Sequence, residues 1–217
     1  MVAHIVGVAQ RLRPDKVLVV VGHQKERVKR ELATNNVEFV EQTVPLGTGD
    51  AVRRTEKILK GFKGDLLILC GDTPLLRPET LQNLVALHRK EAPAATILTA
   101  FLKDPTGYGR IKRNGSGEVL AIVEEADATP EERLIKEVNS GVYLFSAPQL
   151  FSVLAEIKPD NAKGEYYLTD AIHILRKRGQ RVVAWATGEP KEILGVNSPE
   201  ELEIAQKILA KRRGGKE

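Results

Sequence analysis

Two oxygen-bearing side chains that lie far apart in this chain could share one magnesium ion. Asp72 follows an apolar run at residues 65–70, and Asn197 lies in the segment Gly-Val-Asn-Ser at residues 195–198. Proteins hold Mg2+ with one or two oxygen ligands, while water and substrate phosphates fill its remaining positions. One carboxylate and one amide are therefore sufficient, and the two motifs together predict the two halves of a magnesium and phosphate site.

Each motif also has a structural interpretation. Gly-Asp after a strand is a common turn, and Asn-Ser-Pro is a common start of a helix. Short motifs have high false-positive rates, so the structural interpretation is favoured for either motif alone. Their combination favours a site, because Asp72 leaves the carboxyl end of a predicted strand, where open α/β sheets hold their ligands.

The segments that must position these residues alternate between strands and helices. Apolar runs rich in β-branched residues predict strands, and apolar residues spaced three or four apart predict helices. The predicted strands are residues 16–21, 37–40, 66–70, 96–102, 141–145 and 182–186. The predicted helices are residues 5–12, 24–32, 50–59, 78–90, 147–157, 168–178 and 198–213. This order predicts an α/β fold with a mixed, mostly parallel sheet and helices on both faces.

The second half of the chain changes character. Residues 110–113 and 118–123 flank Asn-Gly-Ser-Gly, a strong turn signal that predicts an antiparallel hairpin. We expect this hairpin to belong to a small β-rich lobe, with a cleft between the lobe and the main sheet. Residues 66–70, by contrast, are typical of a strand that is buried on both faces, as in parallel sheets.

The composition predicts a globular cytoplasmic protein. A chain of 217 residues, with 42% hydrophobic and 29% charged residues, can bury a full core. No apolar run approaches the ~20 residues needed to cross a bilayer, and the amino terminus lacks the pattern of a secretion signal. The single cysteine, Cys70, lies in a predicted strand and has no disulfide partner, which fits a reducing compartment.

The mildly basic charge does not indicate a nucleic-acid partner. The formal net charge is +4, but the basic residues are dispersed or gathered at helix ends. Aromatic residues make up only 5% of the chain, and none alternate with these charges as a base-stacking platform would require. The four histidines show no metal-ligand spacing. A small anionic substrate accounts for the charge equally well.

Seven motifs along the chain carry a resemblance to a known family. They are Gln-x3-Leu-Gly-Thr-Gly at residues 42–49, Gly-Asp-x-Pro-Leu at 71–75, Asp-Pro-Thr-Gly-Tyr-Gly-Arg-Ile at 104–111, Ile-Val-Glu at 122–124, Glu-Val-Asn-Ser-Gly at 137–141, Gly-Glu-Tyr-Tyr-Leu-Thr-Asp at 164–170 and Gly-Val-Asn at 195–197. In this order they closely resemble the uridylyltransferase domain of bacterial bifunctional N-acetylglucosamine-1-phosphate uridylyltransferase/glucosamine-1-phosphate acetyltransferase. The resemblance implies a Rossmann-like nucleotidyltransferase fold, that of nucleotide-diphospho-sugar transferases. It also implies condensation of UTP with N-acetylglucosamine 1-phosphate to UDP-N-acetylglucosamine and pyrophosphate.

The resemblance also implies a role for each matching residue. Gln42 would read the uracil edge with one donor and one acceptor, and Gly47 and Thr48 would let the backbone approach the base. Asp72 and Asn197 would hold Mg2+ against the nucleotide phosphates. The residues that would line the sugar pocket are Tyr108, Gly109, Glu124, Asn139 and Thr169. Some of these residues also have a structural alternative: a loop or helix cap at residues 42–48, a turn at Tyr108 and a strand end at Asn139.

The sequence departs from the family in two ways. Asp50 and Pro45 stand where the family usually carries histidine and glutamine, which affects details of base binding. In addition, the chain contains no Leu-x-Ala-Gly-x-Gly-Thr-Arg-Met loop and no following Pro-Lys pair. We therefore expect that roughly 35 residues, one βα unit, are missing, and that two strand edges are left unpaired. No catalytic lysine or arginine is assignable, and we expect little or no turnover.

The expected organisation is a single domain over residues 1–217. Residues 1–105 would form mainly the nucleotide-binding half, and residues 106–217 mainly the sugar-binding half with a closing carboxyl-terminal helix. Because the family's trimer-forming β-helix has no counterpart here, we expect a monomer or weak association. Two alternatives remain open. One is a non-catalytic protein that binds a sugar nucleotide or has a regulatory role, and the other is a glucose-1-phosphate uridylyltransferase or thymidylyltransferase.

Overall fold

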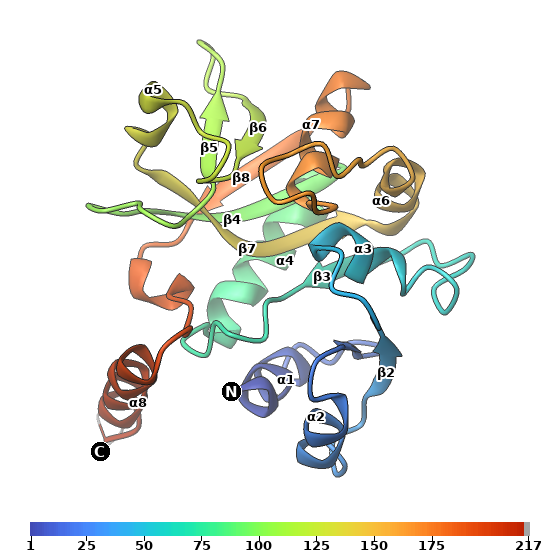
Figure 1. The fold of residues 1–217 in the computed structure, drawn as a ribbon, viewed down its shortest axis with the longest axis vertical. Coiled ribbons are helices and arrows are strands. Elements are labelled where there is room, and N and C mark those ends of the chain that lie inside the picture. Colours follow the sequence, from blue (N-terminus) through green and yellow to red (C-terminus); the bar gives the residue numbers. More distant parts are fainter. Residues whose placement is uncertain (215–217) are drawn as a thin grey trace.

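The centre of the structure is a six-stranded mixed sheet (Figure 1). The computed structural model describes residues 1–214 of the chain. The strand order is β6 (Val119–Val123), β5 (Arg110–Arg113), β7 (Glu137–Ser146), β4 (Ala95–Phe101) and β8 (Val182–Ala186), and β3 (Asp65–Ile68) pairs with the carboxyl-terminal half of β7. β4 runs antiparallel to β7 and parallel to β8. The predicted mixed α/β sheet is confirmed.

This sheet is more antiparallel than the sequence pattern predicts. β7 is a ten-residue strand, and β3, β4 and β5 all pair with it in the antiparallel sense. β5 and β6 form the predicted hairpin, which extends the same sheet. The interpretation of residues 66–70 as a strand buried on both faces is wrong. β3 lies at an edge beside β7, so its apolar side chains are only partly buried.

A second, separate sheet contains the first two strands. β1 (Leu18–Val21) and β2 (Glu38–Glu41) pair in parallel, and α2 (Lys25–Glu31) connects them. Within residues 1–214, no strand pairs with the other edge of β1 or with the outer edge of β3. One edge of β1 therefore has no strand partner in the described part of the chain, and the apolar residues at the start of β1 are partly exposed.

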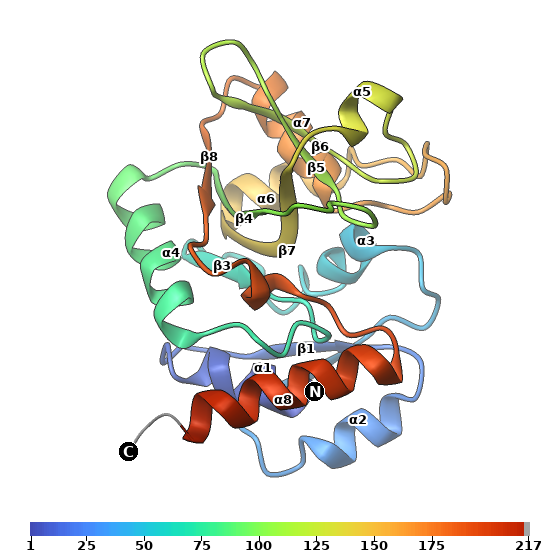
Figure 2. The same cartoon turned by 90° about the vertical axis from the view of Figure 1, so that its left-hand side faces the viewer.

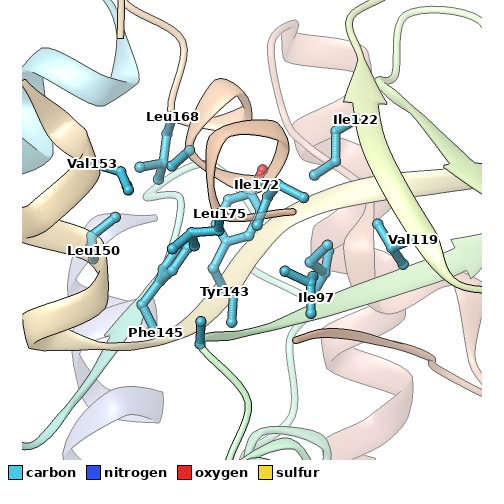
Figure 3. Packing of buried hydrophobic residues seen from close by; sticks show 14 of the residues in the cluster. Ile97, Val119, Ile122, Tyr143, Phe145, Leu150, Val153, Leu168, Ile172 and Leu175 are labelled. Carbon is cyan, nitrogen blue, oxygen red and sulfur yellow. The ribbon is translucent and has the colours of Figure 1, made fainter. Parts of the chain in front are cut away.

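Two apolar clusters cover the two faces of the six-stranded sheet. Because successive strand residues point to opposite faces, Ile97 and Leu98 of β4 belong to different clusters. Ile97 lies in the cluster with α6 (Ala147–Leu154) and α7 (Thr169–Lys177), whose side chains face Tyr143 and Phe145 of β7 (Figure 3). Leu98 lies in the cluster with α1 (Val2–Gln10) and α4 (Pro78–Glu91). Helices therefore lie on both faces, as predicted.

Two elements differ from their predicted bounds, and two short helices were not predicted. α3 (Thr48–Arg53) is shorter than predicted, because the chain after Arg53 continues as turns. β7 begins four residues before its predicted start at 141, since pairing with β4 accommodates its polar residues. The short helices α5 (Pro130–Arg133) and η1 (Pro190–Ile193) were not predicted, although α5 carries a capping box formed by Thr129 and Glu132.

The carboxyl-terminal helix lies at the same end of the molecule as the first helix. α8 (Pro199–Gly214) and α1 both lie at the end opposite the β5–β6 hairpin (Figure 2). Ser198 and Glu201 form the predicted capping box, with bonds of 3.2 and 3.0 Å. Leu75 and Val196 pack with Ala205 of α8, which holds the segments that carry Asp72 and Asn197 against the same helix. No described helix is long and apolar enough to cross a membrane.

Candidate functional site

The structure brings the segments that carry Asp72 and Asn197 together. The backbone N–H of Val196 donates a hydrogen bond of 2.9 Å to the carbonyl oxygen of Asp72. Both side chains are exposed, and neither forms a hydrogen bond or ion pair with another described residue. Within the described residues no cluster of three metal-binding side chains occurs. A carboxylate and an amide on adjoining segments fit a hard cation that takes its other ligands from phosphate and water.

Tyr108 lies in a loop that internal hydrogen bonds and an ion pair hold beside these two segments. Asp104 accepts hydrogen bonds from the backbone and hydroxyl of Thr106, which closes a turn. The almost fully buried Arg110 pairs with Glu125 at 2.7 Å and donates to the carbonyl of Tyr108. Burial raises the pKa of the Tyr108 hydroxyl, a backbone hydrogen bond from Gly195 opposes this, and the charge of Asp72 adds to the rise. Tyr108 thus lies beside the Asp72 and Asn197 segments.

Four of the five predicted sugar-pocket residues form one contact cluster. The Thr169 hydroxyl donates to Oε1 of Glu124 at 3.0 Å, and the Asn139 N–H donates to the carbonyl of Gly109 at 2.8 Å. A Cβ added at Gly109 would lie 3.3 Å from Oε2 of Glu124 and 3.5 Å from the Cβ of Asn139. Because Gly109 has no side chain, the start of β5, the residue that follows β6 and Asn139 of β7 can approach one another closely. We name Gly109, Glu124, Asn139 and Thr169 the carboxylate cluster.

Glu124 is the ionisable member of the carboxylate cluster, and its pKa is raised in the folded protein. Burial raises its pKa, while the Thr169 hydroxyl and the Lys163 charge lower it. Asp127 and Asp170 raise it further by repulsion, and burial also raises the pKa of Asp170. A half-buried carboxyl group of this kind can accept hydrogen bonds from sugar hydroxyls when ionised.

Both ends of the Asn139 amide have hydrogen-bond partners inside the protein. Its amide nitrogen donates to the hydroxyl of Tyr143 at 2.6 Å, and its amide oxygen accepts from the Gly141 N–H at 3.1 Å. One amide hydrogen and one oxygen lone pair stay free of these two bonds, because the amide offers two of each. Asn139 lies within β7 and not at its end, and the predicted sugar contact stays a prediction that these two bonds leave room for.

The loop that carries Gly47 and Thr48 is fastened to the segment before α7. Leu46 accepts a 2.8 Å bond from the Tyr166 N–H, and the Gly49 N–H donates to the Tyr166 carbonyl at 2.7 Å. The Thr48 hydroxyl accepts from the Leu168 N–H at 3.0 Å. Gly47 has φ +108° and ψ 173°, and a Cβ there would lie 2.6 Å from the Tyr166 oxygen. Only glycine fits this approach.

Gln42 is held by partners inside the protein, and its donor is not free. Its Nε2 donates to the carbonyl of Gly47 at 3.0 Å and to Oδ2 of Asp50 at 2.9 Å. Both hydrogens of the amide are thereby used, so the expectation that Gln42 presents a donor and an acceptor does not match this arrangement. A cavity of about 140 Å³ lies beside it, lined by Val21, Gly22, Lys25, Glu41, Gln42 and Thr43.

Asp50 is the partner that sequence reasoning did not assign. It is fully buried and forms ion pairs with Arg53 at 2.9 Å and Arg54 at 3.2 Å. Burial raises the pKa of its carboxyl group, but hydrogen bonds from Gln42, Arg53 and Arg54 outweigh that effect and lower the pKa. In the sequence, Asp50 stood out only because the family usually has histidine at this position. The structure identifies Gln42 as its hydrogen-bond partner.

The segment at residues 166–169 connects two groups of the predicted residues. Thr48 binds the backbone of Leu168, and the next residue, Thr169, binds Glu124. Residues 42–48, which we name the Gln42 loop, and the carboxylate cluster are therefore neighbours, although more than 75 residues separate Thr48 from Glu124. Among the described residues, no lysine or arginine forms an ion pair with Asp72.

Comparisons with known proteins show the family of the chain. The nucleotidyl transferase family pattern matches residues 1–190. The chain is 45% identical over 212 residues to bifunctional protein GlmU of Bacillus licheniformis and 46% identical to that of Shouchella clausii. Each match covers 98% of this chain and 46% of the relative, so the chain spans about half the length of these relatives.

Solved structures support the fold. A UDP-glucose pyrophosphorylase complexed with UDP-glucose matches with a TM-score of 0.75 at 19% identity, covering 96% of this chain and 86% of that one. The apo form of UDP-glucose pyrophosphorylase matches with a TM-score of 0.75 at 18% identity, covering 97% and 86%. At this level of identity the likeness concerns the fold alone.

Proposed function

The chain belongs to the nucleotidyl transferase family, and from that premise we propose that it binds UDP-N-acetylglucosamine and its precursors, UTP and N-acetylglucosamine 1-phosphate. The family match and the GlmU relatives support the transferase class, and the seven motifs described above motivate the choice of substrates. The proposal assigns the Gln42 loop to the uridine, the carboxylate cluster to the sugar, and Asp72 with Asn197 to the phosphates and Mg2+.

The observation that carries the proposal is the bridge at residues 166–169. It fixes Thr48 and Glu124 through bonds of 3.0 Å each to consecutive residues, Leu168 and Thr169. A ligand with a base at one end and a sugar at the other spans two such subsites. The anionic middle of the ligand would then lie toward Asp72 and toward Gly195, whose backbone N–H bonds the Tyr108 hydroxyl.

In the proposed reaction the protein positions its substrates and supplies no nucleophile. An oxygen of the sugar phosphate bonds to the α-phosphorus of UTP while the bond to pyrophosphate breaks, so that atoms and charge balance. Asp72 and Asn197 would hold Mg2+, which neutralises phosphate charge when bound. Glu124 and Asn139 would orient the sugar, and Gln42 the base.

A sugar-nucleotide-binding protein without turnover is the second candidate. The specific observation is that, among the described residues, no lysine or arginine forms an ion pair with Asp72. Cationic groups near the leaving phosphates supply much of the rate in such reactions, and loss of a single stabilising donor costs about 100- to 1000-fold. We expect the 217-residue chain to bind the sugar nucleotide and to turn over far below ~1 per second.

Calorimetric titration of the purified chain with UDP-N-acetylglucosamine and UDP-glucose, with and without Mg2+, tests the proposal. We expect saturable binding, tighter for the N-acetylated sugar, which weakens in a Glu124→Ala variant. The matched control is Glu203→Ala, which removes an exposed carboxylate of α8. Absence of binding to either ligand by the wild type would refute the proposed function. Pyrophosphate release from UTP and N-acetylglucosamine 1-phosphate separates the two candidates.

A further inference from the structure

We propose that Asp50 is a positioning residue that fixes the side-chain amide of Gln42, so that the protein selects a pyrimidine base bearing an N–H at position 3. The proposal rests on the function proposed above, because it assigns Gln42 to the base. It concerns a side chain that the family resemblance does not explain, since histidine usually occupies this position.

The first step is the orientation of the Gln42 amide. One end of the amide meets the carboxylate of Asp50 at 2.9 Å and the carbonyl of Gly47 at 3.0 Å. Both partners accept hydrogen bonds and neither can donate, so the group that meets them must be the NH2. The opposite orientation would place the amide oxygen against two other oxygens. Chemistry therefore fixes this orientation, independent of which atom is drawn as nitrogen.

The second step is the rigidity of Asp50. Its side chain is fully buried, Arg53 approaches one carboxylate oxygen at 2.9 Å and Arg54 the other at 3.2 Å. Arg53 is itself held, with its guanidinium carbon 4.9 Å from the centre of the Tyr166 ring. Two cations favour the ionised carboxylate, so Asp50 remains a hydrogen-bond acceptor near neutral pH. An ionised carboxylate cannot donate a hydrogen bond, so Asp50 does not allow the Gln42 amide to rotate by 180° and exchange its oxygen and nitrogen.

The third step is what remains for a ligand. Both Nε2 hydrogens are used, and no described residue donates to the Oε1 of Gln42. The amide therefore offers the base one acceptor only. Uracil and thymine present an N3–H donor on the pairing edge, between two carbonyl oxygens. Cytosine in the same pose presents an unprotonated N3, so two lone pairs would face each other and the acceptor would stay unpaired.

Asp50→Asn tests the inference, because an asparagine amide can either accept from or donate to Gln42. Dissociation constants of UDP and CDP are measured by calorimetry for the wild type, Asp50→Asn and the acid-to-amide control Glu203→Gln. We expect the wild type and the control to prefer UDP by about 10- to 100-fold, the loss expected for one unpaired buried acceptor. In Asp50→Asn this preference should fall at least fivefold, with CDP binding unchanged or tighter.

A merely structural role for Asp50 would weaken both nucleotides equally and leave their ratio intact, and that result overturns the inference while the proposed function stands. If the wild type binds neither nucleotide, the proposed function and the inference both fail. Gln42→Met provides a second route should Asp50→Asn fail to fold. It removes the acceptor without touching Asp50, so its UDP to CDP ratio should approach 1. A ratio that stays at the wild-type value shows that Gln42 does not discriminate the base and refutes the inference.

Discussion

Replacing Gly47 with alanine should detach the Gln42 loop from the rest of the site. Gly47 has φ +108° and ψ 173°, a region that is essentially restricted to glycine and costs another residue about 1–3 kcal/mol. The new Cβ would lie 2.6 Å from the Tyr166 oxygen and 2.8 Å from its nitrogen, too close for any real contact. The backbone must move apart, which breaks the hydrogen bonds between Tyr166 and the residues on either side of Gly47.

The expected magnitude follows from these two costs. The two bonds with Tyr166, at 2.8 and 2.7 Å, contribute about 0.5–1.5 kcal/mol each. Together with the backbone strain, the loss is about 2–6 kcal/mol, and part of it appears as displacement of the loop rather than as global unfolding. We therefore expect a lower free energy of unfolding and at least tenfold weaker UDP binding, with N-acetylglucosamine 1-phosphate binding little changed.

A matched pair of glycines isolates the cause. Gly61 also has a positive φ, of +80°, but a Cβ there meets nothing within 4 Å. Gly61→Ala should cost only the backbone strain, about 1–2 kcal/mol, and should leave UDP affinity unchanged. The assays are urea unfolding and calorimetric titration of UDP and the sugar phosphate. If Gly47→Ala and Gly61→Ala behave alike in both assays, the packing of Gly47 against Tyr166 does not support the base loop.

Three further predictions concern the sugar side and the pH dependence. Asn139→Ala should weaken binding of N-acetylglucosamine 1-phosphate more than binding of UDP, and equal losses for both ligands in calorimetry would instead indicate disruption of its bonds to Tyr143 and Gly141. Burial raises the pKa of Glu124, so its neutral form is favoured in the folded state. Glu124→Gln should therefore be more stable than the wild type at pH 7, and the gap in urea unfolding should close as the pH falls toward the ordinary carboxyl pKa near 4.5. Burial lowers the pKa of His88, although Asp65 opposes this, so the folded state favours the neutral ring that bonds Thr96 at 2.8 Å. The wild type should lose stability as the pH falls from about 6.5 through the lowered pKa, and a His88→Gln variant should not show this loss.

The local elements of the fold were predictable because their signals are local. β8 was predicted at its observed bounds, and α4 within one residue, because apolar periodicity and a proline at the first helical turn are read from neighbouring residues. The capping box at Ser198 and the hairpin around Asn-Gly-Ser-Gly formed for the same reason. The length of α3 and the start of β7 were not predicted, because contacts with residues distant in the sequence set the bounds of these two elements.

The candidate site was predictable only as a set of residues. The motifs assigned residues to base, sugar and phosphate, and four of the five sugar-pocket residues do meet. Their mutual contacts depend on strands and loops that are distant in sequence, such as Gly109 against Glu124 and Thr48 against Leu168. Asp50 was noticed as a departure from the family, but its bond to Gln42 required the turn at Gly47 that brings the two side chains together.

The sequence by itself determined the family, the alternation of strands and helices, and the residue types available for magnesium, phosphate and sugar. The tertiary structure alone decided that β3 is an exposed edge paired with β7, that the segments of Asp72 and Asn197 adjoin, and that Gln42 keeps only its acceptor free. The physical reason is that periodicity and capping act over a few residues. The partners of a hydrogen-bonding group, by contrast, are chosen by which distant backbone and side-chain groups the packed sheet leaves within about 3 Å of it.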